Sequence, residues 1–247
     1  MRWGVFTAGP KYQNDLSNKI KKFTNFSNCI KISTKVGISR IGSGSHTMAH
    51  YASKLHNRDS RSLEFVVANN IDGLKNGVNN GSFDYFLWET FTTKPLVDNG
   101  ELYEIGIVPT PWTAFSIAMS NDKDKQNIGD TIKTKFYPAL EECVRSFIDE
   151  AKDKFVATNE ENSISNICKI YNHTEDDAKA WFRQTEYAIT NGKLMENNES
   201  QISPFSIDYK STNNALSILK DVELVPNDYQ TEALWDNDIA IIVNKYS

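Results

Sequence analysis

The residues with the clearest chemical potential form the segment Gly42-Ser43-Gly44-Ser45-His46, between an expected strand and an expected helix. Glycines permit a tight turn, and the first turn of a helix leaves backbone N–H groups without intrahelical acceptors. Together with the helix dipole and two serine hydroxyls, these groups favour a carboxylate, sulfonate or phosphate ligand. The pattern is also typical of a plain turn in which Ser45 only caps the helix, and this alternative stays open. It is not a P-loop, because the G-x-x-x-x-G-K-[ST] spacing is absent.

A second candidate site follows the apolar run at residues 83–88 and comprises Trp88, Glu89 and Thr92. Ligands of open parallel sheets bind outside the carboxyl ends of the strands, so these residues are expected near the glycine–serine turn. Glu89 has the charge to pair with an amine, and Trp88 has a ring that can stack on a ligand. The alternative is that Trp88 belongs to the core and that Glu89 is only solvated.

A third candidate is Trp112, which ends the segment Pro109-Thr110-Pro111-Trp112. The two prolines hold the chain extended, as a connection between two lobes requires. Trp112 then lies where a cleft would open, while packing in the core is the alternative.

Catalytic and metal-binding patterns are scarce. His46 and His50 have the four-residue spacing of metal ligands on a helix. However, no glutamate follows His46, as an H-E-x-x-H motif would require, and no acidic residue lies nearby to act as a third metal ligand. The chain also contains no nucleophile elbow, CxxC or GxGxxG pattern. We therefore predict no catalytic residues, no metal and no cofactor.

The elements that position these residues alternate between strand-like and helix-like periods up to Trp112. This order predicts an α/β fold with a parallel sheet and right-handed crossovers. The continuous apolar character of residues 83–88 predicts a sheet covered on both faces. Beyond Trp112 we expect a short strand at 115–119, helices at 140–155, from the capping box at Thr174 and from about Asn213, and a loop at 193–210. The expected strands before Trp112 are 35–40, 63–68, 83–88 and 103–108, and the helices are 47–55, 71–78 and 92–98.

The composition limits the class of partner. Hydrophobic residues make up 39% and charged residues 24%, which is ordinary for a globular protein. The net charge of -5 argues against nucleic acid as the main partner, since phosphate binding requires clustered Lys and Arg. An apolar run of roughly 18 residues is absent, so no membrane partner is expected. Three distant cysteines and an N-terminus unlike a signal peptide predict a cytoplasmic protein.

Three segments together resemble a known family. They are residues 36–46 (VGISRIGSGSH), residues 72–78 (DGLKNGV), and residues 86–95, which begin FLWE and end TTKP. The combination resembles the second lobe of type II periplasmic binding proteins, in the branch that includes nitrate-, sulfonate- and thiamine-precursor-binding proteins. It is closer still to a small fungal subgroup of intracellular proteins with that fold.

The resemblance implies two α/β lobes joined by crossing strands, with a ligand held in the cleft between them. It assigns residues 9–112 to the second lobe, and residues 1–8 with 113–247 to the hinge strands and the helical remainder of the first lobe. Trp3 and Thr7 would belong to the outgoing hinge strand and Trp112 to the return hinge. The full set of expected ligand-binding residues is Trp3, Thr7, Ser43, Gly44, Ser45, His46, Trp88, Glu89, Thr92 and Trp112.

The chain departs from the family pattern at its beginning. Met1 stands almost at the outgoing crossover, so the resemblance predicts a complete second lobe and a first lobe that lacks its opening βαβα units. The apolar stripes of the C-terminal helices would then be uncovered, which predicts self-association through that surface.

The function expected from these observations is non-catalytic binding of a small polar or anionic metabolite, as an intracellular carrier or sensor. The resemblance suggests a thiamine-precursor-like, sulfonate-like or carboxylate ligand. Two alternatives stay open. One is an enzyme similar to thiamine-pyrimidine synthases, with His46 as the first candidate, either as a base or as a sacrificial donor, although the cysteine-rich iron motif of that group is absent. The other is a truncated paralogue without a ligand.

Overall fold

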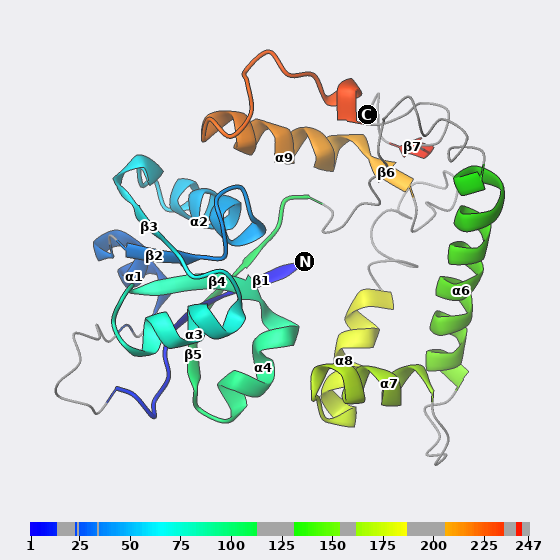
Figure 1. The fold of residues 1–247 in the computed structure, drawn as a ribbon, viewed down its shortest axis with the longest axis horizontal. Coiled ribbons are helices and arrows are strands. Elements are labelled where there is room, and N and C mark those ends of the chain that lie inside the picture. The colour runs from blue at the N-terminus through cyan, green and yellow to red at the C-terminus, as the bar shows by residue number, and fades with distance from the viewer. Residues whose placement is uncertain are drawn as a thin grey trace. The chain divides into compact units, whose positions relative to one another are not determined.

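The protein is described by a computed structural model that covers residues 1–13, 23, 25–33, 35–112, 131–153, 162–186, 206–234 and 241–243. The chain divides into two compact units (Figure 1). The first, here called the sheet unit, comprises Met1–Ala114 and Lys210–Thr231. The second, the helical unit, comprises Phe115–Tyr209 and Glu232–Ser247. Each unit is described by itself.

The sheet unit contains a five-stranded mixed sheet with the strand order β3-β2-β4-β1-β5. Strand β2 pairs in parallel with β3 and β4, whereas β1 runs antiparallel to both β4 and β5. The four predicted strands β2, β3, β4 and β5 all run in the same direction, as expected. The sheet as a whole is mixed and not parallel throughout, because β1 is inserted between β4 and β5 in the opposite direction. The strands are β1 Arg2–Ala8, β2 Lys35–Ile38, β3 Glu64–Val67, β4 Tyr85–Glu89 and β5 Leu102–Pro109.

The helices expected in this unit are all present, and three begin earlier than predicted, including α9, which begins at Tyr209 and not at about Asn213. Helix α2 begins at Gly44 rather than Thr47, since the Ser43 side chain accepts the first free amide, that of His46. Helix α4 begins at Thr90, since the Glu89 side chain caps it. The helices of the sheet unit are α1 Phe26–Ile32, α2 Gly44–Leu55, α3 Ile71–Asn79, α4 Thr90–Asp98 and α9 Tyr209–Asp221.

The sheet has an apolar layer on each face. Side chains alternate across a strand, so neighbours such as Phe86 and Leu87 belong to different clusters. One cluster contains Met48 of α2 and Ile30 of α1, and the other contains Leu74 of α3. Tyr85, Phe86 and Leu87 are all fully buried, which confirms the predicted coverage of both faces.

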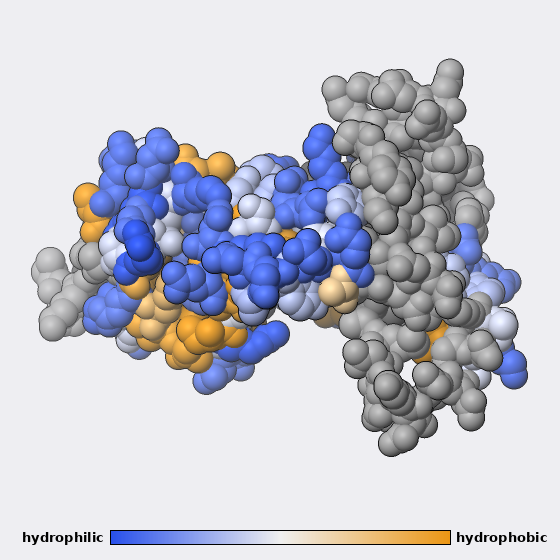
Figure 2. All heavy atoms as spheres, turned by 90° about the horizontal axis from the view of Figure 1, so that it is seen from above, coloured by the Kyte–Doolittle hydropathy of each residue, from blue (hydrophilic) through white to orange (hydrophobic). Residues whose placement is uncertain are grey.

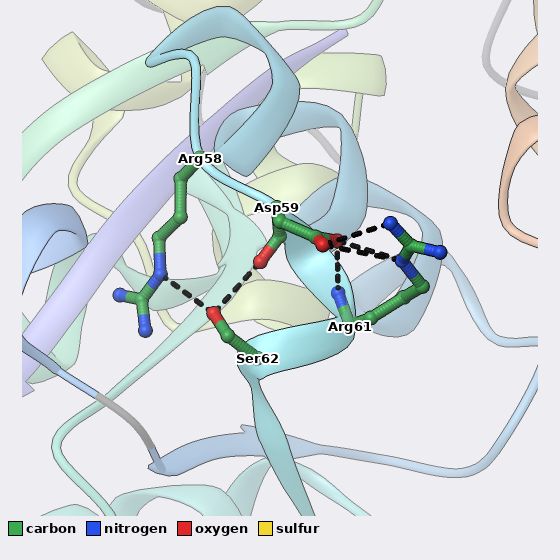
Figure 3. Close-up of polar contacts among 4 residues, drawn as sticks. All are labelled: Arg58, Asp59, Arg61 and Ser62. Carbon is green, nitrogen blue, oxygen red and sulfur yellow. Dashed lines mark hydrogen bonds and ion pairs between the residues drawn. The ribbon is translucent and has the colours of Figure 1, made fainter.

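The connection from α2 to β3 is fixed by polar contacts (Figure 3). Arg58 donates from Nε to the Ser62 hydroxyl at 3.2 Å, and that hydroxyl donates to the Asp59 carbonyl at 2.7 Å. Arg61 pairs with the Asp59 carboxylate at 2.9 Å. Arg58 also donates to the carbonyls of Ile30 and Ser33 at the end of α1. These contacts tie the segment that leads into β3 to the neighbouring helix.

Helix α9 packs with the sheet unit from Lys210 onward. Its Asp221 forms an ion pair with Lys54 of α2. The side-chain amide of Asn214 donates to the Pro111 carbonyl at 3.4 Å, close to Trp112. Leu216 and Ile218 are the buried apolar residues of this helix.

The helical unit contains α6 Tyr137–Asp153, α7 Ser163–Tyr171 and α8 Glu175–Glu186, and a parallel pair of short strands, β6 Ser206–Asp208 and β7 Ile241–Val243. Phe147 of α6 meets Phe182 of α8 with ring centroids 6.3 Å apart. The Thr174 hydroxyl accepts the Asp177 amide at 3.2 Å, which confirms the predicted cap of α8. The loop predicted at 193–210 is wrong at Ser206–Asp208, which form β6. The strand predicted at 115–119 lies outside the described residues.

In the part of the chain that the structure describes, no helix has the length and apolar character needed to cross a membrane. Figure 2 shows hydrophobic areas among the hydrophilic residues on the described surface. The large hydrophobic side chains most exposed in the sheet unit include Ile32, Ile41, Leu55 and Val67. None of the three cysteines forms a disulfide, as the sequence predicted.

Candidate functional site

Three helices begin at the same edge of the sheet, directly after the carboxyl ends of parallel strands (Figure 1). They are α2, α3 and α4, capped by the side chains of Ser43, Asn70 and Glu89. Helix N-termini carry a partial positive charge and free amides, so this edge favours anions. It is also the edge where open α/β sheets bind ligands.

The three N-termini differ in charge. Helix α3 carries Asp72 in its first turn, and α4 is capped by the carboxylate of Glu89. Helix α2 has no acidic residue in its first turn and is capped by a neutral serine. The positive end of α2 is therefore the only one of these three that has no carboxylate in its own cap or first turn to balance the helix dipole.

The glycine–serine turn is held by hydroxyl groups that face inward. The Ser45 hydroxyl accepts the Ser39 amide at 3.0 Å and lies 2.9 Å from the Ser43 hydroxyl. All three serines are buried. Gly42 adopts a left-handed conformation with φ of 76°, which suits glycine. The serine side chains of this turn therefore stabilise the turn instead of lying open to solvent.

The backbone of the same turn has free donors. Among the described residues, the amides of Gly44 and Ser45 have no acceptor, whereas the His46 amide bonds to Ser43. Gly44 itself is exposed. Two adjacent amides at the positive end of α2 therefore have unused hydrogen-bonding capacity for an anion, and the exposed Gly44 provides the access.

An aromatic side chain lies against this turn. The Trp3 ring of β1 lies so close to Gly44 that a Cβ at Gly44 would be 2.7 Å from a ring carbon. Trp3 also meets Trp88 of β4 edge to face, with ring centroids 6.5 Å apart. The Trp3 indole nitrogen is buried and has no acceptor among the described residues. The structure thus brings together three predicted site residues, Trp3, Gly44 and Trp88.

Glu89 and Thr92 belong to the cap of α4. The two carboxylate oxygens of Glu89 accept the amides of Phe91 and Thr92, each at 2.9 Å. Thr92 is exposed, and its hydroxyl donates to the Glu89 carbonyl at 3.3 Å. Glu89 pairs with Trp3 in the β1–β4 register, so it lies at the same edge. Because both carboxylate oxygens of Glu89 already accept amides of α4, they are less available to a ligand amine.

His46 lies in the interior. Its Nδ1 accepts the Gly42 amide at 3.1 Å, and its Nε2 lies 3.1 Å from Nε2 of His50. Both rings contact Phe65 of β3, with centroids 4.5 Å and 4.9 Å away. Burial lowers the pKa of both histidines, and His50 falls to about 4 with a further contribution from His46. Both are therefore neutral at pH 7.

The two remaining predicted residues lie in different places. Trp112 contacts Tyr51 of α2, with ring centroids 6.1 Å apart, and its carbonyl accepts the Thr110 hydroxyl at 2.9 Å. Thr7 is buried, and its hydroxyl donates to the Tyr103 carbonyl at 3.4 Å. Thr7 lies four residues from Trp3 along β1, roughly 13 Å at strand spacing. The structure does not bring Thr7 to the end of the strand where Trp3 meets Gly44.

Ser39 and Phe65 are contributors that the sequence patterns did not indicate. Ser39 holds Ser45 from the end of β2, and Phe65 covers both histidines from β3. Both contacts are set by tertiary packing, so helix or strand periodicity gives no signal for them. Among the described residues, no group of three or more His, Cys, Asp or Glu side chains could hold a metal ion.

Comparison with known proteins agrees with this architecture. A family model described as Ca3427-like PBP matches residues 8–108, somewhat less than half of the chain. The solved structure of the Candida albicans CA3427 gene product is similar, with a TM-score of 0.65 and 22% sequence identity. That alignment covers 94% of this chain and 65% of the other, so this chain spans about two thirds of that protein's length. No curated protein matches the sequence.

The CA3427 gene product is described as defining a new family with the generic periplasmic binding protein fold. The match over residues 8–108 includes the glycine–serine turn and the first turn of α4. The similarity in structure extends over most of this chain. We conclude that the chain has the periplasmic-binding-protein-like fold, with mixed α/β content.

Proposed function

We propose that the sheet unit binds a small polar or anionic metabolite at the carboxyl edge of its sheet, at the first turn of α2. The observation that carries this proposal is the position of the Trp3 indole against Gly44, beside the free amides of Gly44 and Ser45. An aromatic ring next to adjacent backbone donors offers both an apolar wall and an anion contact. Trp88 extends the aromatic wall through its contact with Trp3.

The fold supports the proposal in general terms, because the periplasmic binding protein fold is one that holds ligands. The charge pattern adds a specific argument, since α3 and α4 provide carboxylates at their own N-termini and α2 does not. The ligand classes that fit are those with one anionic group and a small apolar or ring portion. Sulfonates, carboxylates and thiamine-precursor-like molecules with a phosphate all meet this description.

We propose binding without catalysis, in the role of a cytoplasmic carrier or sensor. The enzyme alternative would need His46 as a base, and both ring nitrogens of His46 are already in hydrogen bonds. The hydroxyls of Ser43 and Ser45 bond to each other instead of to a general base. These contacts favour a preformed binding turn over a reactive group.

The test begins with native mass spectrometry of the purified chain to detect a retained small molecule. Thermal shift measurements with sulfate, methanesulfonate, acetate and an aminopyrimidine phosphate then rank the ligand classes. We expect the anions with an attached apolar group or ring to raise the melting temperature more than sulfate. If no member of the panel shifts the melting temperature at millimolar concentration and no adduct is retained, the proposed function is wrong.

A further inference from the structure

A chain of hydrogen bonds joins the interior of the sheet unit to the glycine–serine turn. His50 and His46 lie one turn apart on α2, with their Nε2 atoms 3.1 Å from each other. Nδ1 of His46 lies 3.1 Å from the backbone nitrogen of Gly42. Gly42 comes directly before Ser43, the cap of α2, so the chain ends at the segment that presents the Gly44 and Ser45 amides.

The Gly42 amide, at the outer end of this series of hydrogen bonds, determines where each histidine carries its proton. The Gly42 amide can only donate, so Nδ1 of His46 carries no proton. Neutral His46 then carries its proton on Nε2 and donates to Nε2 of His50. His50 must carry its own proton on Nδ1, an atom that is buried and has no acceptor among the described residues. One backbone amide therefore fixes the tautomer of both histidines.

An additional proton cannot be accepted without loss of a hydrogen bond. If His46 gains it on Nδ1, two N–H groups face each other and the Gly42 bond breaks. If His50 gains it on Nε2, that proton opposes the proton of His46. While the two rings stay in hydrogen-bond contact, the conflict is relieved only when the His46 proton moves to Nδ1, which again breaks the Gly42 bond. Every protonated state that keeps the His46–His50 bond therefore releases Gly42.

The environment of the pair offers no compensating charge in the part of the chain that the structure describes. Phe65 of β3 contacts both rings. The pKa of each histidine is lowered by burial, with no carboxylate contribution. The charged or titratable side chains on elements packed against α2 have other partners or are buried: Lys35 with Glu64, Lys54 with Asp221, Asp59 with Arg61, Glu89 at the cap of α4, and the Tyr85 phenol in the core.

We infer that His46 is a positioning residue for the binding turn, and that protonation of the His46–His50 pair releases Gly42 and weakens anion binding at Gly44 and Ser45. This inference rests on the proposed function, which places the anion at that turn. It makes a prediction opposite in sign to simple electrostatics, because a positive charge near an anion site would by itself strengthen binding. Acidification therefore acts as a release signal for the ligand.

The first test needs no ligand. Hydrogen exchange of the Gly42 amide is measured by NMR at about pH 7 and about pH 4, where His50 is half protonated, corrected for intrinsic exchange. We expect Gly42 protection to fall about fivefold at the lower pH, because one hydrogen bond is lost in the protonated molecules, while amides in β4 keep their protection. Equal protection of Gly42 at both values would overturn the inference.

Two substitutions at position 46 distinguish the role of His46 as the hydrogen-bond acceptor of Gly42 from its ability to gain a proton. His46→Asn keeps an oxygen near the place of Nδ1 but does not titrate, so Gly42 should be protected equally at both pH values. His46→Leu removes the acceptor, so Gly42 should exchange rapidly at both. His56→Gln, at the C-terminal end of the same helix, is the control histidine and should behave as wild type. Loss of pH dependence in His56→Gln, or its retention in His46→Asn, would contradict the inference.

Sulfate then tests the link to binding, because it keeps its charge over this pH range. We expect its affinity to fall about twofold from about pH 7 to about pH 4, where His50 is half protonated, in the wild type and to stay constant in His46→Asn. Tighter sulfate binding at the lower pH would overturn the inference. Absence of sulfate binding at both pH values, with Gly42 exchange still pH-dependent, would instead refute the anion site of the proposed function and confirm only the His46–Gly42 bond.

Discussion

The Trp3 indole occupies the space that a side chain at Gly44 would need, with a ring carbon 2.7 Å from the ideal Cβ position. The residues come from β1 and from the start of α2, and 41 positions of sequence separate them. Their contact explains why a glycine stands in the first turn of α2 although alanine favours helices more. It also places an aromatic ring beside the two free amides of that turn.

Gly44→Ala should displace Trp3 and change its packing against Trp88. A tryptophan circular dichroism signal is expected from the Trp3–Trp88 ring pair, and it should decrease in this variant. Gly106→Ala is the matched control, because its Cβ would meet Phe26 instead of Trp3 at the same 2.7 Å. If both variants leave the tryptophan signal unchanged, the close contact of Trp3 with Gly44 does not exist in solution.

Trp3→Leu should weaken binding of the best anion of the panel by about 1–3 kcal/mol, the usual cost of removing an aromatic contact from a partly desolvated site. Isothermal titration calorimetry measures this change. Tyr103→Leu, an exposed aromatic position on β5, should bind as wild type. A Trp3→Leu variant that is folded and binds with unchanged affinity would show that Trp3 does not contact the ligand.

Glu89→Ala should lower the free energy of unfolding by about 1 kcal/mol, because two amides of the first turn of α4 lose their acceptors. Urea denaturation measures the loss. Glu64→Ala is the control, since Glu64 forms an exposed ion pair with Lys35, and such pairs contribute little. A loss in Glu89→Ala no larger than in the control would contradict the capping role.

The unfolding free energy should depend on pH through His50. Its pKa is lowered from 6.5 to about 4 in the folded protein, mainly by burial, so the unfolded chain binds more protons between these values. Stability is then fully present above about pH 6.5 and falls as the pH is lowered toward about 4, by on the order of 2–3 kcal/mol.

Denaturation at several pH values measures this slope. His50→Gln, which keeps an acceptor near the place of Nε2, should flatten the curve over that range. His56→Gln should retain the wild-type dependence. Equal slopes for wild type and His50→Gln would show that His50 does not control stability in acid.

The sequence was sufficient for the local elements of the sheet unit but not for their arrangement. Periodicity located β2, β3, β4 and β5, and the apolar run before Trp88 predicted a strand buried on both faces. It could not place β1 between β4 and β5, because strand order depends on long-range pairing that no local pattern encodes. The direction predicted for β5 was correct, since β4 and β5 are both antiparallel to β1, but the expected direct pairing of β4 with β5 was wrong.

The site was only partly predictable for a related reason. The turn 42–46 contains two serines at possible cap positions, and only the geometry selects Ser43 over Ser45. The sequence suggested that Glu89 pairs with a cationic group of the ligand, although its carboxylate accepts two backbone amides of α4. His46 and His50 have metal-ligand spacing, but Phe65 comes from β3 to cover them.

The most direct test of the proposed function is a titration of the ¹⁵N-labelled chain with sulfate, followed by the backbone amide shifts. The account predicts saturable shifts at Gly44 and Ser45, and smaller ones at the first turns of α3 and α4, where Asp72 and Glu89 already provide negative charge. Equal or larger shifts at the starts of α3 and α4, or no saturable shift at Gly44 and Ser45, would contradict it.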